Sequence, residues 1–341
     1  MDTPGLYFRA FYGVPRSVRA PDGMPVNAVR GVLDVLARQI VELTPRHLVC
    51  CFDADWRPAF RVELLASYKA HRVAGGLDAD ERVVPGPADA AGDGGASAEV
   101  VEEIPDELGA QLPVLDAMLD AFGIARAESA GFEADDVIGT LAARFPPSGG
   151  RGDWTASDPD PSGVGPLAGP VEVLTGDRDL FQLIRDDVPV RVRYAVEKFA
   201  LVDEGAVAAR YGIPGRSYAD FATLRGDPSD GLPGVAGIGA KTAAAILMRH
   251  GSLAGALAAL DAGQVDGFPA AARRRLGDAR DYLARAEVVV RVVPDVALPA
   301  LRTALPAVPA DPAAVAALAA RFGLASAVGR LSRALAAVAG A

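Results

Sequence analysis

Lysine is scarce in this 341-residue chain, where it occurs only at Lys69, Lys198 and Lys241, and arginine carries nearly all the other positive charge. Cysteine is scarcer still, with two residues, and histidine occurs three times. Cys50 and Cys51 are adjacent in an apolar run, so they cannot close a loop with a disulfide, and two cysteines are too few for a structural zinc site. The sequence therefore excludes a disulfide framework and a zinc-stapled fold.

Long apolar stretches are also missing. No run of about eighteen apolar residues occurs, so the sequence offers no membrane-spanning segment. Near the start, Asp2, Thr3, Pro4 and Arg9 interrupt any signal-peptide core. We therefore expect a cytoplasmic protein that makes no membrane contact.

The net charge of −10 argues at first against nucleic-acid binding. Its distribution changes that interpretation. Residues 78–107 hold ten acids and one arginine, a local balance of −9, which leaves the rest of the chain near neutral at −1. Residues 57–72 carry +3, from four basic residues and one acid. A nucleic-acid site outside the acidic tract is therefore compatible with the composition.

The hydrophobic periodicity indicates an α/β fold. Short apolar runs predict buried strands, and between them apolar residues recur at helical spacing, which favours a mainly parallel central sheet with flanking helices. From about Tyr211 onward only Ala-rich helices follow, so we predict an α/β domain over 1–210 and a helical region over 211–341, with its last helix at 313–338 packing locally. The predicted strands are 47–52, 171–174 and 188–192, and the predicted helices before Tyr211 are 26–43, 112–122 and 132–145.

Two segments interrupt this alternation. Residues 74–100 are rich in Gly and Asp, and residues 146–170 are rich in Gly, Pro, Ser and Asp. Neither segment has enough apolar surface to order itself, so we expect both to be mobile insertions.

Acidic side chains gather at strand ends and helix starts. Asp53 follows the first predicted strand, and Asp177 and Asp179 follow the second. Because the carboxyl ends of parallel strands lie at one edge of a sheet, these side chains are expected to converge. The other acids lie at the start of a helix, as Glu133, Asp135 and Asp136, and in a turn, as Asp227 and Asp230.

Each acidic motif alone has an ordinary explanation, because acids favour the first turn of a helix and Asp side chains cap helices and turns. Together they would repel one another unless cations neutralise them. Ligand sets made only of oxygen favour Mg²⁺ or Mn²⁺ over zinc, and two such ions about 3.5–4 Å apart suit displacement at a phosphodiester. The histidines lie outside these motifs, and no serine or cysteine nucleophile constellation is present.

A glycine-rich segment follows the last acidic motif. Gly234, Gly237 and Gly239 permit a tight turn with bare backbone N–H groups ahead of a helix that starts near Lys241. This pattern is typical of a grip on a phosphate backbone. A nucleotide P-loop needs its second glycine directly before the lysine, whereas here one residue separates Gly239 from Lys241.

Taken together, these motifs resemble the 5′-nuclease family, which includes the nuclease domain of bacterial DNA polymerase I, phage 5′-exonucleases and flap endonucleases. The resemblance runs from Asp2 to about Val293, and because no polymerase domain follows, the chain resembles a stand-alone form. It implies a PIN-like nuclease core and a helix–three-turn–helix at about 220–250. The motifs that carry it are Leu6–Phe11, Cys51–Ala54, Phe60–Arg61, Tyr68–Arg72, Gly131–Val137, Thr175–Leu180 and Gly226–Val235.

The resemblance implies two metal sites and a DNA-binding surface. Residues of about 57–110 resemble a helical arch that receives the 5′ strand. The base of this arch (Arg57–Arg72) holds several basic residues, for which the ordinary alternative explanation is a solvated helix face. In some members the helix–three-turn–helix also binds potassium through backbone carbonyls. The implied metal ligands are Asp2, Asp53, Glu133, Asp135 and Asp136 for one site and Asp177, Asp179, Asp227 and Asp230 for the other. The implied phosphate ligands that stabilise developing charge are Arg61, Lys69 and Arg72, and the implied DNA contacts are Arg9, Arg57, Tyr68, Gly234, Gly237, Gly239, Lys241 and Thr242.

One departure from the family concerns the start of the chain. In the family the first metal-binding Asp ends a central apolar strand, whereas here only Met1 precedes Asp2. Without that strand we expect a gap in the sheet, a poorly held Asp2 and an α-amino group near the metals. We interpret the departure as a start of translation further upstream; a shortened chain or a true loss of the strand are the alternatives.

We therefore expect a structure-specific 5′-3′ exonuclease or flap endonuclease that hydrolyses DNA near 5′ ends, nicks or flaps. It would act as a monomer and associate with the nucleoid. Two alternatives stay open: an impaired module that binds DNA junctions without cleaving them, and a PIN-like ribonuclease.

Overall fold

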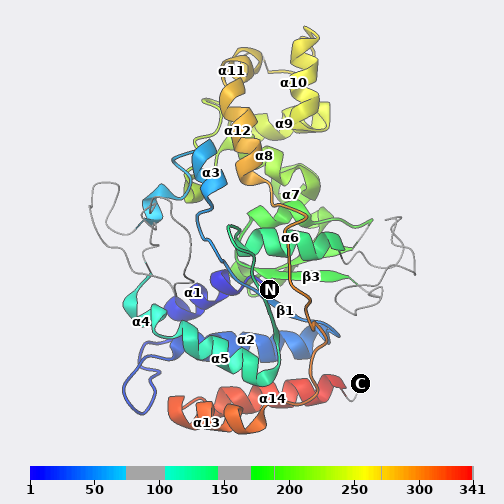
Figure 1. The fold of residues 1–341 in the computed structure, drawn as a ribbon. Helices are drawn as coiled ribbons and strands as arrows, with labels where there is room; N and C mark the ends of the chain where they lie inside the picture. Colours follow the sequence, from blue (N-terminus) through cyan, green and yellow to red (C-terminus); the bar gives the residue numbers. More distant parts are fainter. Residues whose placement is uncertain (74–103, 145–169, 188, 270, 340–341) are drawn as a thin grey trace.

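The computed structural model describes residues 1–73, 104–144, 170–187, 189–269 and 271–339. Short strands form its centre (Figure 1). The two predicted insertions, 74–100 and 146–170, lie outside the described residues except for Pro170. The strands are β1 (Val49–Cys51) and β2 (Ala125–Ala127), paired in parallel, β3 (Val171–Thr175) and β4 (Val190–Tyr194), also paired in parallel, and β5 (Ala200–Val202), antiparallel to β4.

The first two residues join these two sheets. The amide of Asp2 donates to the carbonyl of Leu174 at 2.9 Å, and the amide of Cys51 donates to the carbonyl of Met1 at 2.9 Å. The α-amino group of Met1 donates to the carbonyl of Val49 at 2.9 Å. The strand order is therefore β5-β4-β3-(Met1–Asp2)-β1-β2. Two residues bridge the expected gap, and the sheet is mainly parallel, as predicted.

Alternating side chains of the strands face two hydrophobic cores. Cys51 and Val173 belong to one core, and Cys50 and Leu174 belong to the other. This alternation is what a strand buried on both faces requires. The first core includes α6 (Ala134–Arg144), and the second includes α1 (Thr3–Gly13), α2 (Asn27–Leu43) and α5 (Leu112–Phe122).

Helix α1 was not predicted, although it positions the first acidic residue. Asp2 is its N-cap, and the carboxylate accepts the amide of Gly5 at 2.8 Å, a typical way to satisfy a free N–H at a helix start. Gly31 of α2 lets the two helices approach closely, because a Cβ there would lie 2.6 Å from the Cβ of Ala10. The N-cap contact at the start of α1 therefore helps to hold Asp2 at the centre of the sheet.

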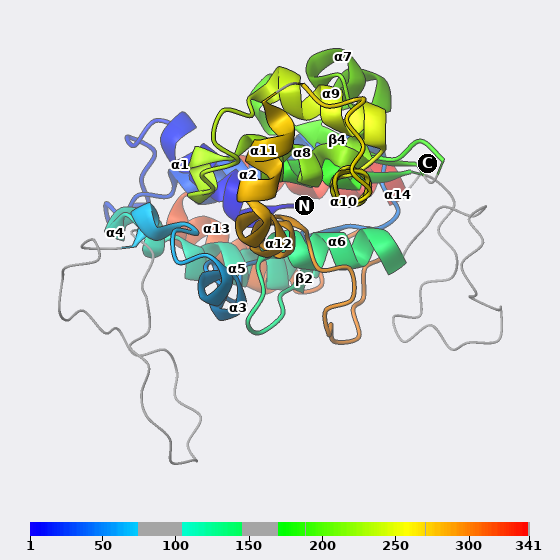
Figure 2. The ribbon, with the colours of Figure 1, turned by 90° about the horizontal axis from the view of Figure 1, so that it is seen from above.

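The helical region follows β5 and lies at the opposite end of the molecule from α2 and α5 (Figure 1), so that α9 and α11 stand in front of α2 in the view from above (Figure 2). Its central helix pair, α8 and α9 with η5 between them, covers the range predicted for the helix–three-turn–helix. The predicted helix start near Lys241 is observed at Ala240. The elements are α7 (Glu204–Tyr211), η4 (Gly215–Ser217), α8 (Tyr218–Arg225), η5 (Pro228–Asp230), α9 (Ala240–His250), α10 (Leu253–Asp261), α11 (Ala272–Asp278) and α12 (Arg280–Val290).

The last two helices do not pack locally within this region, which corrects our prediction for the end of the chain. Helices α13 (Pro312–Phe322) and α14 (Ala325–Ala339) pack against α5 and α2 in the second core. Figure 1 shows them at the far end from α9 to α11. Arg330 of α14 donates to Asp34 of α2 at 2.6 Å, which ties the pair to the α/β half of the fold. A long connection after α12 carries the chain back.

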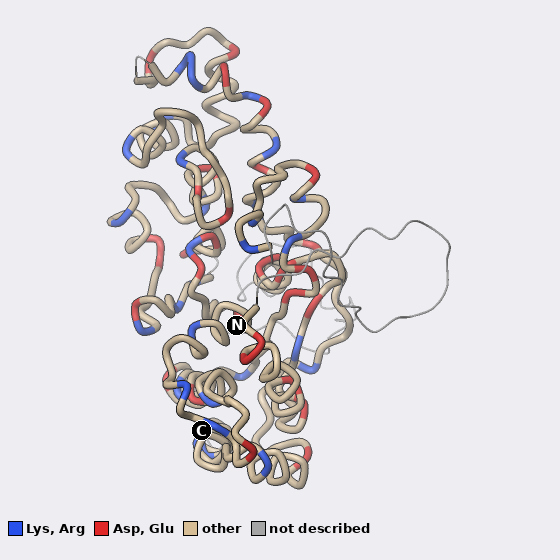
Figure 3. The backbone as a smooth tube through the Cα atoms, turned by 90° about the vertical axis from the view of Figure 1, so that its left-hand side faces the viewer, with Lys and Arg blue, Asp and Glu red and all other residues tan. Residues whose placement is uncertain are grey.

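The base of the predicted arch is described up to Val73. It contains α3 (Ala59–Leu64) and η1 (Ala70–Arg72), and α4 (Asp106–Gly109) follows the undescribed stretch. The remaining short 3-10 elements are η2 (Asp179–Leu183) and η3 (Ala195–Glu197). In Figure 3, basic and acidic stretches are interleaved along the described chain in this view. This pattern agrees with the near-neutral balance outside the acidic tract.

Among the described residues, no single helix has the length and apolar character needed to cross a membrane. The bent pair α9 and α10 has that length and composition, but both helices contribute side chains to the first core.

Candidate active site

Asp2 lies at the centre of the sheet with both carboxylate oxygens held. The hydroxyl of Thr175 donates to its Oδ2 at 2.6 Å, and the amide of Gly5 donates to its Oδ1. Its side chain is buried, with 5% of the residue exposed. The expectation that Asp2 would be poorly held is therefore wrong, because β3 and the start of α1 both fix it.

Asp53 lies just beyond β1, where it meets the start of α6. Its Oδ1 accepts the amide of Ala134 at 2.7 Å. Burial raises the pKa of Asp53 to about 7, although the charge of Lys69 lowers the pKa, and the charge of Glu133 raises it further. The carboxylate therefore sits in an environment that penalises its negative charge.

Four more acids share this environment. Burial raises the pKa of Asp135 well above its ordinary range, and the charges of Asp177 and Asp2 add to the effect. Burial likewise raises the pKa of Asp177, of Asp179 and of Asp230. Acids from strand ends, a helix start and a turn thus act on one another's pKa. We call Asp2, Asp53, Asp135, Asp177, Asp179 and Asp230 the acidic cluster.

Asp179 contains an unpaired oxygen atom in this cluster. Its Oδ1 is buried and has no hydrogen-bond partner among the described residues. The neighbouring Asp177 turns its Oδ1 back to accept the amide of Asp179 at 2.7 Å. An orphaned carboxylate oxygen in a buried site is costly unless a cation or proton satisfies it.

Glu133 is engaged by three donors from the arch base. The ammonium of Lys69 contacts its Oε1, and the hydroxyl of Tyr68 donates to its Oε2 at 2.7 Å. Arg61 donates to the same Oε2 at 2.6 Å. Lys69 therefore lies beside the acidic cluster, where its charge lowers the pKa of Asp53. Its contact with a phosphate stays a prediction. The structure does not fit the predicted contact between Tyr68 and DNA, because Tyr68 is buried and its hydroxyl donates to Glu133.

Arg61 does not fit the predicted role of phosphate ligand. Only 2% of it is exposed, and its guanidinium donates on every side. Nη1 and Nη2 each donate to Asp136 at 2.7 Å, while Nε donates to the carbonyl of Val289 at 2.9 Å. With Glu133 and the carbonyl of Arg291 as further acceptors, no donor is left for a phosphate. Arg61 instead joins α3 to α6 and α12.

The same contacts correct the predicted role of Asp136 as a metal ligand. Both of its oxygens accept from Arg61, its Oδ1 also accepts the amide of Val293 at 2.9 Å, and its Oδ2 accepts the amide of Glu133 at 3.2 Å. None of the residue is exposed. A carboxylate satisfied in this way is a structural ion-pair partner rather than a metal ligand.

Asp227 is likewise engaged and does not fit as a metal ligand. Its Oδ1 accepts the amide and the hydroxyl of Ser229, so it caps η5. Its Oδ2 accepts from Arg225 at 3.1 Å and lies 3.6 Å from Arg178. Neither arginine was predicted as a site residue, although Arg178 stands between Asp177 and Asp179 and Arg225 stands two residues before Asp227.

Arg72 and Arg57 brace the arch base in different ways. Arg72 donates to the carbonyl of Ser229 at 2.8 Å and to Asp230 at 3.1 Å, with about a third of its side chain (35%) exposed. Arg57 donates to the carbonyls of Tyr68 and Ala66 at 2.6 and 2.8 Å. Arg72 thus contacts Asp230 of the acidic cluster, whereas Arg57 binds backbone carbonyls within the arch base.

Arg9 is exposed and lies over the turn that follows β3. Its Nη2 donates to the carbonyl of Ala195 at 3.3 Å, and a Cβ on Gly176 would lie 3.1 Å from its Cδ. The guanidinium is therefore next to the turn that carries Asp177.

The glycine-rich segment forms the expected turn before α9. Gly234 and Gly237 have φ of +70° and +73°, which favours glycine. Gly239 is the N-cap of α9 and, like Lys241, is exposed, while Thr242 is half-buried. The N–H of Gly234 is not free, because it donates to the hydroxyl of Tyr282 at 3.0 Å. Of the predicted free N–H groups, that of Gly234 is therefore excluded, and only those nearer the start of α9 stay candidates for binding a phosphate.

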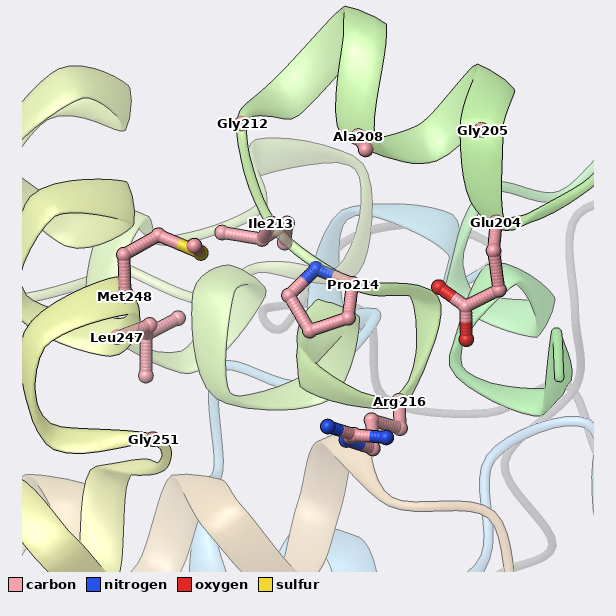
Figure 4. Close-up of a pocket in the computed structure, with 10 residues that line it drawn as sticks. All are labelled: Glu204, Gly205, Ala208, Gly212, Ile213, Pro214, Arg216, Leu247, Met248 and Gly251. Atoms are coloured by element: carbon pink, nitrogen blue, oxygen red, sulfur yellow. The ribbon is translucent and has the colours of Figure 1, made fainter. Parts of the chain in front are cut away.

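A separate groove of about 630 Å³ lies between α7 and α9 (Figure 4). Apolar side chains such as Ile213, Leu247 and Met248 line most of it. Its one acid, Glu204, accepts the amide of Gly215 at 2.6 Å. This groove lacks converging carboxylates and carries none of the predicted site residues.

Comparison with known proteins identifies the family. Residues 1–212 match the 5′-3′ exonuclease N-terminal resolvase-like domain, and residues 213–313 match the 5′-3′ exonuclease C-terminal SAM fold. A 5′-3′ exonuclease of Streptomyces coelicolor is 51% identical over 340 residues, which cover 99% of both chains. A 5′-3′ exonuclease of Mycobacterium tuberculosis is 46% identical over 345 residues, which cover 98% of this chain and 96% of that protein.

Solved structures share the fold. A bacteriophage T5 protein co-crystallised with metal ions has a TM-score of 0.57 at 16% identity, with 99% of this chain and 97% of that chain covered. The catalytic core of Rad2 in complex with DNA substrate has a TM-score of 0.50 at 15% identity, with 97% and 90% covered. The two matched domains and the high identity to full-length relatives show that this chain belongs to the 5′-3′ exonuclease family.

Proposed function

We propose that this protein hydrolyses DNA phosphodiester bonds near 5′ ends, nicks or flaps, as a 5′-3′ exonuclease with flap endonuclease activity. The acidic cluster at the sheet edge, reached by the ammonium of Lys69, is the observation that carries the proposal. The names of the Streptomyces coelicolor and Mycobacterium tuberculosis relatives agree with it. Such a site joins groups that hold cations to a residue that can neutralise a phosphate.

The residues of the acidic cluster suit divalent cations. Among the described residues no three His, Cys, Asp or Glu side chains form a ready-made metal site. The unpaired Oδ1 of Asp179, the raised pKa of Asp53, Asp135, Asp177, Asp179 and Asp230, and the purely oxygen donor set nevertheless fit Mg²⁺ or Mn²⁺. Such ions neutralise phosphate charge and activate water. We propose Asp2, Asp53 and Asp135 as holders of one ion and Asp177, Asp179 and Asp230 as holders of the other, with Glu133 at the first site if Lys69 moves away.

Two cations of the chain itself act on the phosphate in this proposal. Lys69 lies against Glu133, and Arg72 lies against Asp230. Each can turn from its carboxylate toward a phosphate that enters the cluster and stabilise the charge that develops there. Arg61 is left out because its donors are already used.

The start of α9 and Arg9 hold the nucleic acid in this proposal. The first N–H groups of a helix have no partner within it, and the exposed Lys241 stands in that first turn. Together with Gly237, Gly239 and Thr242 they form a grip on the duplex backbone. A potassium ion bound by carbonyls of the same turn, a monomeric state, and a cytoplasmic, nucleoid-associated location remain predictions.

A 5′-labelled flap substrate tests the function. Wild type should cleave it in Mg²⁺ or Mn²⁺, and Asp179→Asn should not, while Asp186→Asn, an exposed acid outside the cluster, should cleave like wild type. Flap binding without cleavage by wild type would establish the junction-binding alternative. Cleavage of RNA in preference to DNA would establish the ribonuclease alternative.

A further inference from the structure

The arch base rests on the turn that precedes the glycine-rich segment. The amide of Lys69 donates to the carbonyl of Asp230 at 3.1 Å. Arg72 donates to the carbonyl of Ser229 at 2.8 Å and to Asp230 at 3.1 Å. Three hydrogen bonds thus join segments that lie about 160 residues apart in sequence, and all three end on the η5 turn (Asp227–Gly231).

Gly231 makes this close contact possible. Its φ is +70°, and a Cβ there would lie 2.0 Å from the carbonyl oxygen of Ser67 and 2.9 Å from its carbonyl carbon. The same Cβ would be 3.5 Å from the amide nitrogen of Lys69. These are backbone atoms, so no side-chain rotation can relieve the clash. Any larger residue must push the arch base away from the turn.

Lys69 has an unusual backbone conformation at this contact. Its φ is +49°, a region that residues other than glycine seldom adopt and that persists only when the surroundings enforce it. Its side chain is held at the other end by Glu133 and by the carbonyl of Trp56 at 3.4 Å. The position of the ammonium in the acidic cluster therefore depends on where the backbone of Lys69 is held.

We propose that Gly231 is a positioning residue for Lys69. Its bare Cα lets the η5 turn receive the backbone of Ser67–Lys69, so the element that begins the DNA-gripping segment also sets the ammonium in the acidic cluster. This inference rests on the proposed function, in which Lys69 acts on the phosphate.

A matched pair of variants tests the inference. Gly231→Ala adds both the φ strain and the clash, whereas Gly263→Ala adds a Cβ at φ +71° with nothing within 4 Å. Single-turnover cleavage should fall roughly 10- to 100-fold in Gly231→Ala, as expected when a reacting group shifts by about 1 Å. Its flap affinity should stay within about twofold of wild type, and Gly263→Ala should match wild type. Gly231→Asn, which tolerates positive φ better but keeps the clash, should also be slow.

A double-mutant cycle and a fluorescence measurement exclude a merely structural effect. In a Lys69→Ala background, adding Gly231→Ala should slow cleavage no further, and an additive loss would overturn the inference. With Trp154→Phe, Trp56 is the sole tryptophan, and its emission should shift in Gly231→Ala but not in Gly263→Ala. Unchanged emission would also overturn it. Absence of cleavage by wild type would instead count against the proposed function, and the Trp56 emission would still decide the positioning role.

Discussion

Arg61 is the residue whose predicted role differs most clearly from its position in the structure. As a phosphate ligand it would matter for DNA affinity, whereas the structure makes it the partner of Asp136 and Glu133 in a buried ion pair. The exposed fraction is 2% for Arg61, 0% for Asp136 and 3% for Glu133. Removal of Arg61 would leave a buried carboxylate without its cation, which typically costs about 3–5 kcal/mol.

We therefore expect Arg61→Met to lower the free energy of unfolding by about 3–5 kcal/mol. Urea denaturation followed by circular dichroism measures this quantity. The control is Arg38→Met, which removes an exposed pair with Glu42 at 3.6 Å and should cost at most about 1 kcal/mol. Arg61→Met combined with Asp136→Leu should recover part of the loss, because no unpaired carboxylate then remains at Asp136.

A loss below about 1 kcal/mol for Arg61→Met would refute the ion-pair reasoning, since an exposed pair costs as little. Unchanged stability together with weaker flap binding would return Arg61 to the predicted phosphate-binding role. Arg61→Lys sharpens the comparison, because lysine keeps the charge but cannot donate to both oxygens of Asp136 and to the carbonyl of Val289 at once. It should therefore be destabilising too.

Three further predictions follow from the same geometry. Asp177→Asn should abolish flap cleavage while DNA binding is retained; loss of binding measured by fluorescence anisotropy would contradict the role of Asp177 in chemistry alone. Lys241→Ala should reduce the slope of log affinity against log salt concentration by about one, and an unchanged slope would remove Lys241 from the phosphate contacts. The pKa of Asp53, near 7 when folded against 3.8 in its ordinary state, means that the folded protein binds more protons than the unfolded chain between these values. Without metal, the free energy of unfolding should therefore fall as pH rises toward 7, and Mn²⁺ should bind more tightly at pH 8 than at pH 6. Calorimetry measures this affinity, and its change with pH should be smaller in Asp53→Asn than in wild type. An equal change in both proteins would contradict the assignment of Asp53 as a metal ligand.

Much of the fold follows from local periodicity. Helix 112–122 is observed at the predicted bounds and helix 26–43 within one residue, because both have a continuous apolar stripe. Strands β2 and β5 were missed because each has only three residues and neither lies in an apolar run as long as Leu48–Phe52, which indicated the equally short β1. The docking of α13 and α14 on α5 and α2 depends on contacts between distant segments, which no local pattern records.

The acidic motifs could be placed from the sequence, but their members could not be sorted. Asp135 and Asp136 are adjacent in the chain, and yet one lies in the acidic cluster while the other is bound to Arg61. The difference arises because successive residues of a helix point in different directions, and because the partner comes from α3, 75 residues away. Spacing alone carries no information about such a partner.

The way in which cations hold each carboxylate separates the structural acids from the functional ones. Asp136 and Asp227 are held by arginines, which stay charged at any physiological pH: two donors of Arg61 bind Asp136, and Arg225 and Arg178 both lie against Asp227. Glu133 also faces Lys69, a compact point charge that can leave its carboxylate without breaking a two-donor arrangement. A chain with only three lysines places one of them in the acidic cluster. Because a phosphate must compete for such a cation during a reaction, cations held by a single contact to a carboxylate, such as Lys69 and Arg72, belong beside the reacting groups. The arginines that hold Asp136 and Asp227 belong in the frame around those groups.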